Sequence, residues 1–223
     1  KYLGRFHTPD DNARAISLCL DSGIRPSFNF MLFDPDCALK DIALTLDFAE
    51  QYLHVPWNVC RTEIYSGTRL LDRLKSEDRL EGDFRTYGYQ MKDLAAEIMF
   101  RIMRISFQNR SFSFDSLINK LISLSFARQV HEELMPGPGT DSMSAKVDEL
   151  VVEVYRDTVS ELRRIMGFAS TADFGDLNKM RDFAIDTAVS INERDHHWLT
   201  RAEQLFTLLD ARGARIRRGA QTG

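Results

Sequence analysis

The sequence lacks the features that would place a protein in a membrane or on nucleic acid. It has no apolar run near the roughly 20 residues that a transmembrane helix needs, and no signal-peptide pattern follows the first residue, Lys1. The formal net charge of −4 disfavours binding to nucleic acid or to an acidic membrane surface. These absences predict a cytoplasmic protein with neither a nucleic-acid partner nor a membrane partner.

Cysteine is also scarce, and its placement disfavours the metal sites in which it is common. The three cysteines, Cys19, Cys37 and Cys60, lie too far apart in the sequence for a zinc ribbon, a redox pair or a cluster-binding loop. We expect them to be thiols of a reducing compartment. Glu193 and His197 are one helical turn apart but lie in a charged stretch, so we interpret them as surface residues and expect no metal site.

Residues 1–90 alternate helix signals with strand signals. A hydroxyl and a proline open a helix at Thr8 and Pro9, and Gly23 ends it. The order strand, helix, strand, helix is then expected over 26–33, 39–53, 58–65 and 66–79. This order is typical of parallel β/α winding, and parallel strands need neighbours and cover on both faces. We therefore predict an α/β fold in which residues 1–90 form part of a parallel, TIM-like β/α barrel.

After Lys92 the pattern changes to helical periodicity with polar breaks. Long helices are expected over 93–107, 114–134, 142–166 and 173–209. The barrel segment is thus followed by an all-α helical extension, for which we expect the bounds 91–212. Residues 213–223 are expected to be a flexible tail, because they hold basic residues and little that could be buried.

Side chains on a strand alternate between its two faces, and the second strand places charges on one of them. Arg61 and Glu63 share that face, and burying such charges costs free energy unless they are paired or functional. A ligand-holding barrel requires a polar interior of this kind, although a salt bridge that only fills the interior would explain the same charges. The residues expected to face the interior are Asn29, Met31 and Phe33 from the first strand and Arg61, Glu63 and Tyr65 from the second.

Each predicted strand ends in a turn that lies where a β/α fold places its ligand-contacting loops. The first turn is Asp34-Pro35-Asp36 and the second is Ser66-Gly67-Thr68. Gly67 allows a close approach of the backbone, and Thr68 opens a helix whose amide groups attract anions. Helix capping alone would also explain Thr68. The second turn adds Gly67 and Thr68 to the candidate binding residues. A phosphate-binding β/α enzyme is one interpretation of the sequence, and it rests on this turn alone.

The order and spacing of these elements resemble a known family. The run from Phe30 to Pro35, the helix after it, and the strand and turn from Asn58 to Thr68 resemble radical S-adenosylmethionine proteins with an N-terminal cobalamin-binding domain. In that family, a strand ending near a proline turn is followed by a helix and then by a strand ending in a Tyr-x-Gly-Thr-like turn. The resemblance covers residues 1–90, and the helical part is only loosely similar to the family's C-terminal extension.

The resemblance implies an enzyme that uses a 4Fe–4S cluster, S-adenosylmethionine and cobalamin. Such an enzyme forms a 5′-deoxyadenosyl radical and modifies a small-molecule substrate, often by methyl transfer. The resemblance assigns no catalytic residue. It implies that the cavity for S-adenosylmethionine or substrate is lined by Asn29, Met31, Phe33, Arg61, Glu63, Tyr65, Gly67 and Thr68.

The family's cluster ligands and cobalamin domain are absent from this sequence. No CxxxCxxC loop occurs, so we expect that this chain alone binds no cluster and forms no radical. Because Lys1 stands where an initiator Met would and the strands lack partners, we expect a fragment that works with the remainder of its own polypeptide. The alternative is a non-catalytic helical interaction module with a vestigial β/α segment.

Overall fold

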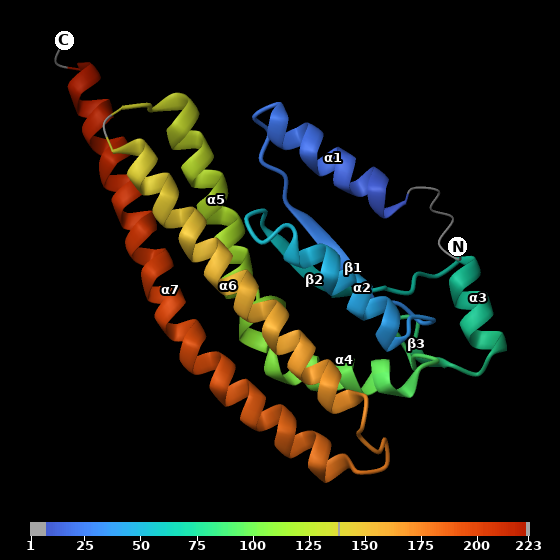
Figure 1. Cartoon of the computed structure of the whole chain (residues 1–223). Helices are drawn as coiled ribbons and strands as arrows, with labels where there is room; N and C mark the ends of the chain where they lie inside the picture. Colours follow the sequence, from blue (N-terminus) through green and yellow to red (C-terminus); the bar gives the residue numbers. More distant parts are fainter. Residues whose placement is uncertain (1–7, 138, 222–223) are drawn as a thin grey trace.

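The computed structural model describes residues 8–137 and 139–221, with side chains described as far as residue 213. It is mostly helical, at 66%, and has an α/β part followed by a helical part (Figure 1). The α/β part consists of α1 (Pro9–Asp21), β1 (Phe28–Phe33), α2 (Leu39–Glu50), β2 (Trp57–Arg61), α3 (Arg69–Ser76), β3 (Leu80–Asp83) and β4 (Thr86–Tyr89). The helical part consists of α4 (Leu94–Ser106), the π-helix η1 (Gln108–Phe112), α5 (Leu117–Leu134), α6 (Thr140–Ala169) and α7 (Leu177–Gln221).

Helix α1 begins and ends where the local signals predict. The Thr8 hydroxyl accepts a hydrogen bond from the backbone N–H of Asp11 at 3.2 Å, and the Asp11 carboxylate accepts one from the backbone N–H of Thr8 at 2.9 Å. This reciprocal pair is a capping box, and Pro9 follows it in the first turn. Gly23 has φ +74°, the left-handed conformation that glycine adopts without a steric cost. The predicted bounds of this helix are confirmed.

The predicted TIM-like barrel is wrong. Strands β1 and β2 form a two-stranded parallel sheet, and β3 and β4 form a separate antiparallel sheet. Within the described residues no third strand joins either sheet, whereas a TIM barrel has eight strands. The parallel pairing of β1 with β2 is as predicted, because strands joined through a helix return in the same direction. That local order does not specify how many further strands join the pair.

The register of the β1–β2 pair interrupts the expected alternation of faces. Met31 lies beside Cys60, whereas Phe33 lies beside Arg61, because the register shifts between Met31 and Phe33. Three residues of β1 were expected to face inward beside Arg61. Of these, only Phe33 is its neighbour in the sheet. One continuous polar face shared by both strands does not form.

The β3–β4 hairpin was not expected from the sequence. Each of its strands has four residues, and β3 carries acidic residues and a glycine, which are unfavourable in strands. A Cβ on Gly82, whose φ is +76°, would clash with the carbonyl oxygen of Thr86, so this close approach requires glycine. The hairpin is tied to the parallel sheet by the Tyr89 hydroxyl, which donates to the Phe33 carbonyl at 3.1 Å.

The sheet and the helices share one hydrophobic core. Helix α6 contacts α2, α4, α5 and α7, and Figure 1 shows it between the long α7 and the α/β part. Trp57 of β2 and Tyr155 of α6 are both buried, and their ring centroids are 4.4 Å apart. The parallel sheet is therefore completed by helices of the second half of the chain and not by further strands.

The C-terminal helix is longer than expected. Helix α7 continues to Gln221, so residues 213–221 of the expected flexible tail are helical, and residues 222–223 lie outside the described residues. Among the helices that the structure describes, none is both long and apolar enough to cross a membrane.

Candidate functional site

An open groove of about 1060 Å³ lies along β2 and beyond its carboxyl end. We call it the β2 groove. Residues 58–66 form one side, and the hairpin residues 84–89 form another. The C-terminal half of α4 and the π-helix η1 close it with Phe100, Arg104, Gln108, Ser111 and Phe112. The open edge of β2 and the hairpin thus create a concave surface at the end of a parallel sheet, a place where α/β proteins bind ligands.

Arg61 is a charge of the β2 groove that several neighbouring groups hold in place. Its guanidinium carbon lies 3.9 Å from the centroid of the Tyr89 ring and 4.1 Å from that of Phe100, so cation–π contacts hold it from two rings. The same group donates to the Tyr89 carbonyl and lies 3.8 Å from the carboxylate of Glu97. Its Nε is buried and has no hydrogen-bond partner among the described residues. Arg61 is therefore a positioned cation with a donor to spare.

Buried partners fix the orientation of Arg61. Glu97 is 3% exposed, and its carboxylate accepts from the Met91 backbone N–H at 3.0 Å and from Arg101 Nε at 2.8 Å. Burial raises the pKa of Tyr89 to about 12, although the neighbouring Arg61 acts in the opposite direction. Tyr89 therefore stays neutral near neutral pH, and the negative charge of Glu97 is shared between Arg61 and Arg101.

Glu63 and Tyr65 lie in the same groove as Arg61. Both are exposed, and the Tyr65 hydroxyl donates to the Glu63 carboxylate. This hydrogen bond to a negative charge raises the pKa of Tyr65. The structure therefore brings together the three site residues expected from the second strand.

The other expected site residues do not line the β2 groove. Phe33 is buried beneath it, with its ring centroid 5.3 Å from that of Phe100. Asn29 lines a small cavity under α1 instead, and Met31 is the neighbour of Cys60. The Thr68 hydroxyl accepts from the Leu71 backbone N–H at 3.3 Å and thereby caps α3. Capping is thus the role that the structure shows for Thr68.

Gly67 has a conformational role that the sequence only partly indicates. Its φ is +76°, and no atom lies within 4 Å of where a Cβ would be. Glycine is needed for the left-handed backbone at this turn and not for a close approach of the chain.

The turn after β1 holds ion pairs that the sequence did not indicate. Asp36 accepts from Arg73 of α3 at 2.6 Å and from Arg79 at 3.2 Å. Burial alone would raise the pKa of Asp36, but hydrogen bonds and charge from the two arginines outweigh it and lower the pKa. The expected ligand-contacting loop is therefore a junction between α3, the start of the hairpin and the sheet.

The stretch around Glu193 is less uniformly exposed than its charge indicates. His196 and His197 are exposed, but Asp195 is buried and pairs with Arg110 of η1 at 2.6 Å. Burial raises the pKa of Asp195 in spite of the arginine. Arg110 is fully buried and also contacts Asp157 at 2.7 Å. These charges link η1 to α6 and α7 inside the core, so we assign them a structural role.

The described residues contain no group of three His, Cys, Asp or Glu side chains that could hold a metal ion. Cys19, Cys37 and Cys60 lie on separate segments of the chain, and burial raises the pKa of Cys37 to about 12. Comparison with known proteins adds no assignment, since no family model, no curated protein and no solved structure matches this chain. The resemblance to the radical enzymes stays a prediction.

Proposed function

We propose that this chain provides the surface that faces S-adenosylmethionine and substrate in a cobalamin-dependent radical S-adenosylmethionine enzyme. The observation that carries the proposal is the grouping of Arg61, Glu63 and Tyr65 in the β2 groove, beyond the end of a parallel strand. The resemblance to the family implies that these same residues line the reactant cavity. The proposal concerns this groove and requires no barrel within the chain.

The groups in the β2 groove suit S-adenosylmethionine, which carries a carboxylate, an ammonium group and an adenine ring. Arg61 offers a fixed cation for the carboxylate, and Glu63 offers an anion for the ammonium group. Tyr65 and Phe84 are exposed aromatic rings on which adenine can stack. When bound, this cofactor would supply a radical to the substrate, and the residues named here would bind it and orient it.

The cluster and the cobalamin would be held elsewhere. The described residues offer no set of cysteines that fits a cluster, so no step of radical formation is assigned to them. We assign both groups to the remainder of the same polypeptide, which would also complete the wall of the β2 groove. The reaction would be methyl transfer or another radical modification of a small molecule.

Calorimetric titration of the chain with S-adenosylmethionine tests the proposal. We expect saturable binding by the wild type and a dissociation constant about tenfold or more higher for Arg61→Met. The reason is that a hydrogen bond to a charged group contributes about 1.5–3 kcal/mol. Arg61→Lys keeps the charge but loses the planar fork, so its affinity should be intermediate. Glu63→Gln should weaken binding because it removes the partner of the ammonium group.

The matched control is Arg181→Gln, which removes an exposed arginine of α7 that is paired with its neighbour Asp182. This variant should bind as the wild type does, and thermal unfolding of every variant would verify that each is folded. Equal affinity of the Arg61→Met and Arg181→Gln variants would contradict the proposal. A wild-type chain without affinity for S-adenosylmethionine would favour the non-catalytic helical interaction module instead.

A further inference from the structure

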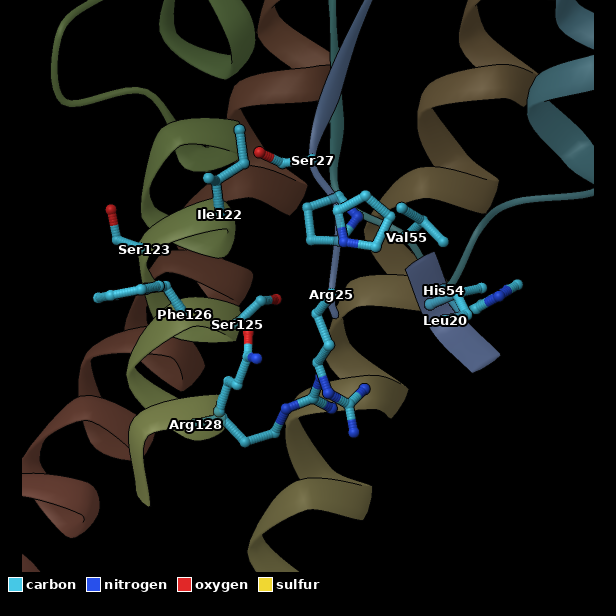
Figure 2. A pocket seen from close by; sticks show the side chains of 13 residues that line it. Leu20, Arg25, Ser27, His54, Val55, Ile122, Ser123, Ser125, Phe126 and Arg128 are labelled. Carbon is cyan, nitrogen blue, oxygen red and sulfur yellow. The ribbon is translucent and has the colours of Figure 1, made fainter. Parts of the chain in front are cut away.

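A second cavity lies at the amino ends of β1 and β2, away from the β2 groove (Figure 2). Its volume is about 360 Å³, which is within the range of small-molecule sites. Residues 25–27 before β1, residues 54–56 before β2 and one face of α5 form its walls. We call it the α5 cavity.

Much of the lining of the α5 cavity is apolar. It includes Ile122 and Phe126 of α5 and the two prolines that precede the strands, Pro26 and Pro56. Phe126 is 68% exposed although it lines a cavity. Transfer of such a ring from water to an apolar neighbour is favourable, so a ligand with an apolar body would gain free energy here.

Two arginines give the α5 cavity a positive end. Figure 2 shows Arg25 and Arg128 with their guanidinium groups at the same end of the cavity, and both lie near Glu132, at 3.2 Å and 3.8 Å. Arg128 is 3% exposed and also pairs with Asp148. Its Nε is the atom that lies 3.8 Å from Glu132; this atom is buried and makes no hydrogen bond to any described residue. A buried donor of this kind is costly unless a partner supplies an acceptor.

The acids that balance these arginines do not line the α5 cavity. Among the described residues, its lining contains no aspartate and no glutamate. The hydroxyls of Ser27 and Ser125 also line it and make no hydrogen bonds to the described part of the chain. The surface that a ligand would meet therefore presents two cations and two unused hydroxyls beside an apolar wall.

We propose that the α5 cavity binds a small carboxylate with an apolar tail. The carboxylate accepts hydrogen bonds from the guanidinium groups of Arg25 and Arg128 and from the Ser125 hydroxyl. The apolar tail covers Ile122 and Phe126. This site is distinct from the β2 groove and does not depend on the function proposed for it.

Calorimetric titration of the full chain with octanoate tests this site. Octanoate should bind saturably with one molecule per chain, because it has both a carboxylate and an apolar tail. Acetate lacks the tail and octyltrimethylammonium reverses the charge, so each should bind at least about tenfold more weakly. Arg25→Gln should raise the dissociation constant of octanoate about tenfold. Ser125→Leu should abolish binding because the larger side chain fills the cavity without breaking a hydrogen bond.

Arg181→Gln again serves as the control, since it removes an arginine remote from the α5 cavity and should leave octanoate binding unchanged. Phe126→Ala supplies a further test should Ser125→Leu fail to fold, and it should weaken octanoate more than acetate. The proposal is overturned if octanoate shows no saturable binding at millimolar concentration. It is also overturned if octyltrimethylammonium binds as tightly, or if Arg25→Gln and Phe126→Ala bind octanoate as the wild type does.

Discussion

Asp36 joins three segments of the α/β part through its carboxylate. It lies after β1 and pairs with Arg73 of α3 and with Arg79, which precedes β3. Arg79 also donates to the carbonyls of Pro35 and Gln90. The carboxylate is 20% exposed and the arginine side chains are 25% and 15% exposed, so water and salt screen these pairs less than they screen surface pairs.

Replacing Asp36 by asparagine should lower the free energy of unfolding at neutral pH by about 1 kcal/mol, because Arg73 and Arg79 each lose one anionic partner, although both also lie near Glu77. The pKa of Asp36 is lower in the folded chain than its ordinary value of 3.8. The unfolded state therefore binds the proton first as the pH falls. The stabilisation by Asp36 is complete above pH 3.8 and is lost as the pH falls through the lower folded pKa.

Urea unfolding of the wild type and Asp36→Asn, measured from neutral to acidic pH, checks this prediction. The difference between the two proteins should shrink in acid. Asp186→Asn is the control, because Asp186 is exposed on α7 and forms no ion pair with the described residues. A difference between wild type and Asp36→Asn that is the same at every pH would show that the ion pairs are not its source.

Strand β2 is anchored to helix α6 at its first residue. The Tyr155 hydroxyl accepts from the Trp57 backbone N–H at 2.8 Å and donates to the Trp57 carbonyl at 2.6 Å. Tyr155 is fully buried, and burial raises its pKa. One side chain thus satisfies two backbone groups that a neighbouring strand would satisfy in a wider sheet.

The variant Tyr155→Phe should lower the free energy of unfolding by about 1–3 kcal/mol. It keeps the ring and opens no cavity, but it leaves the N–H and C=O groups of Trp57 buried without partners. Tyr52→Phe is a matched control, since Tyr52 is half-buried and its hydroxyl makes no hydrogen bond to the described residues. Denaturant titrations followed by circular dichroism would compare them, and equal losses in both variants would refute the anchoring role of the hydroxyl.

The whole molecule has one core, and each half of the chain contributes one tryptophan to it. The sequence contains two tryptophans. Trp57 is buried in the sheet, and Trp198 of α7 donates to Glu153 of α6 at 3.3 Å. The side chains of the parallel sheet are buried against the helices. If the helical part unfolded first, many of these side chains would become exposed to water.

The chain should therefore unfold in one transition. In Trp198→Phe, the fluorescence of Trp57 should change at the same urea concentration as the far-ultraviolet circular dichroism. In Trp57→Phe, the unfolding midpoint from Trp198 fluorescence should equal the midpoint from circular dichroism. Both midpoints should lie at a lower urea concentration than in the wild type, because a smaller ring replaces the buried indole. Distinct midpoints for the sheet tryptophan and the helical signal within one variant would show two independent units divided near residue 90.

Local signals predicted most of the helices and part of the candidate site. The capping box of Thr8 and Asp11 and the apolar periodicity act within a few residues, so they can be interpreted from the sequence alone. The charges of Arg61 and Glu63 on one strand indicated a polar surface at the end of β2, and both residues line the β2 groove. The hairpin that supplies the opposite wall was missed because its strands are short and polar.

The sequence by itself determined where α1 starts and stops, that β1 and β2 run in parallel, and that Arg61, Glu63 and Tyr65 come together. Only the tertiary structure decided that the sheet has two strands, because β2 is completed by a residue 98 positions away, Tyr155. The tertiary structure also decided that Asp36 pairs with arginines and that Arg61 lies against the rings of Tyr89 and Phe100. Propensities and caps depend on neighbours in the sequence, whereas strand number, register and ion pairs depend on contacts between distant segments.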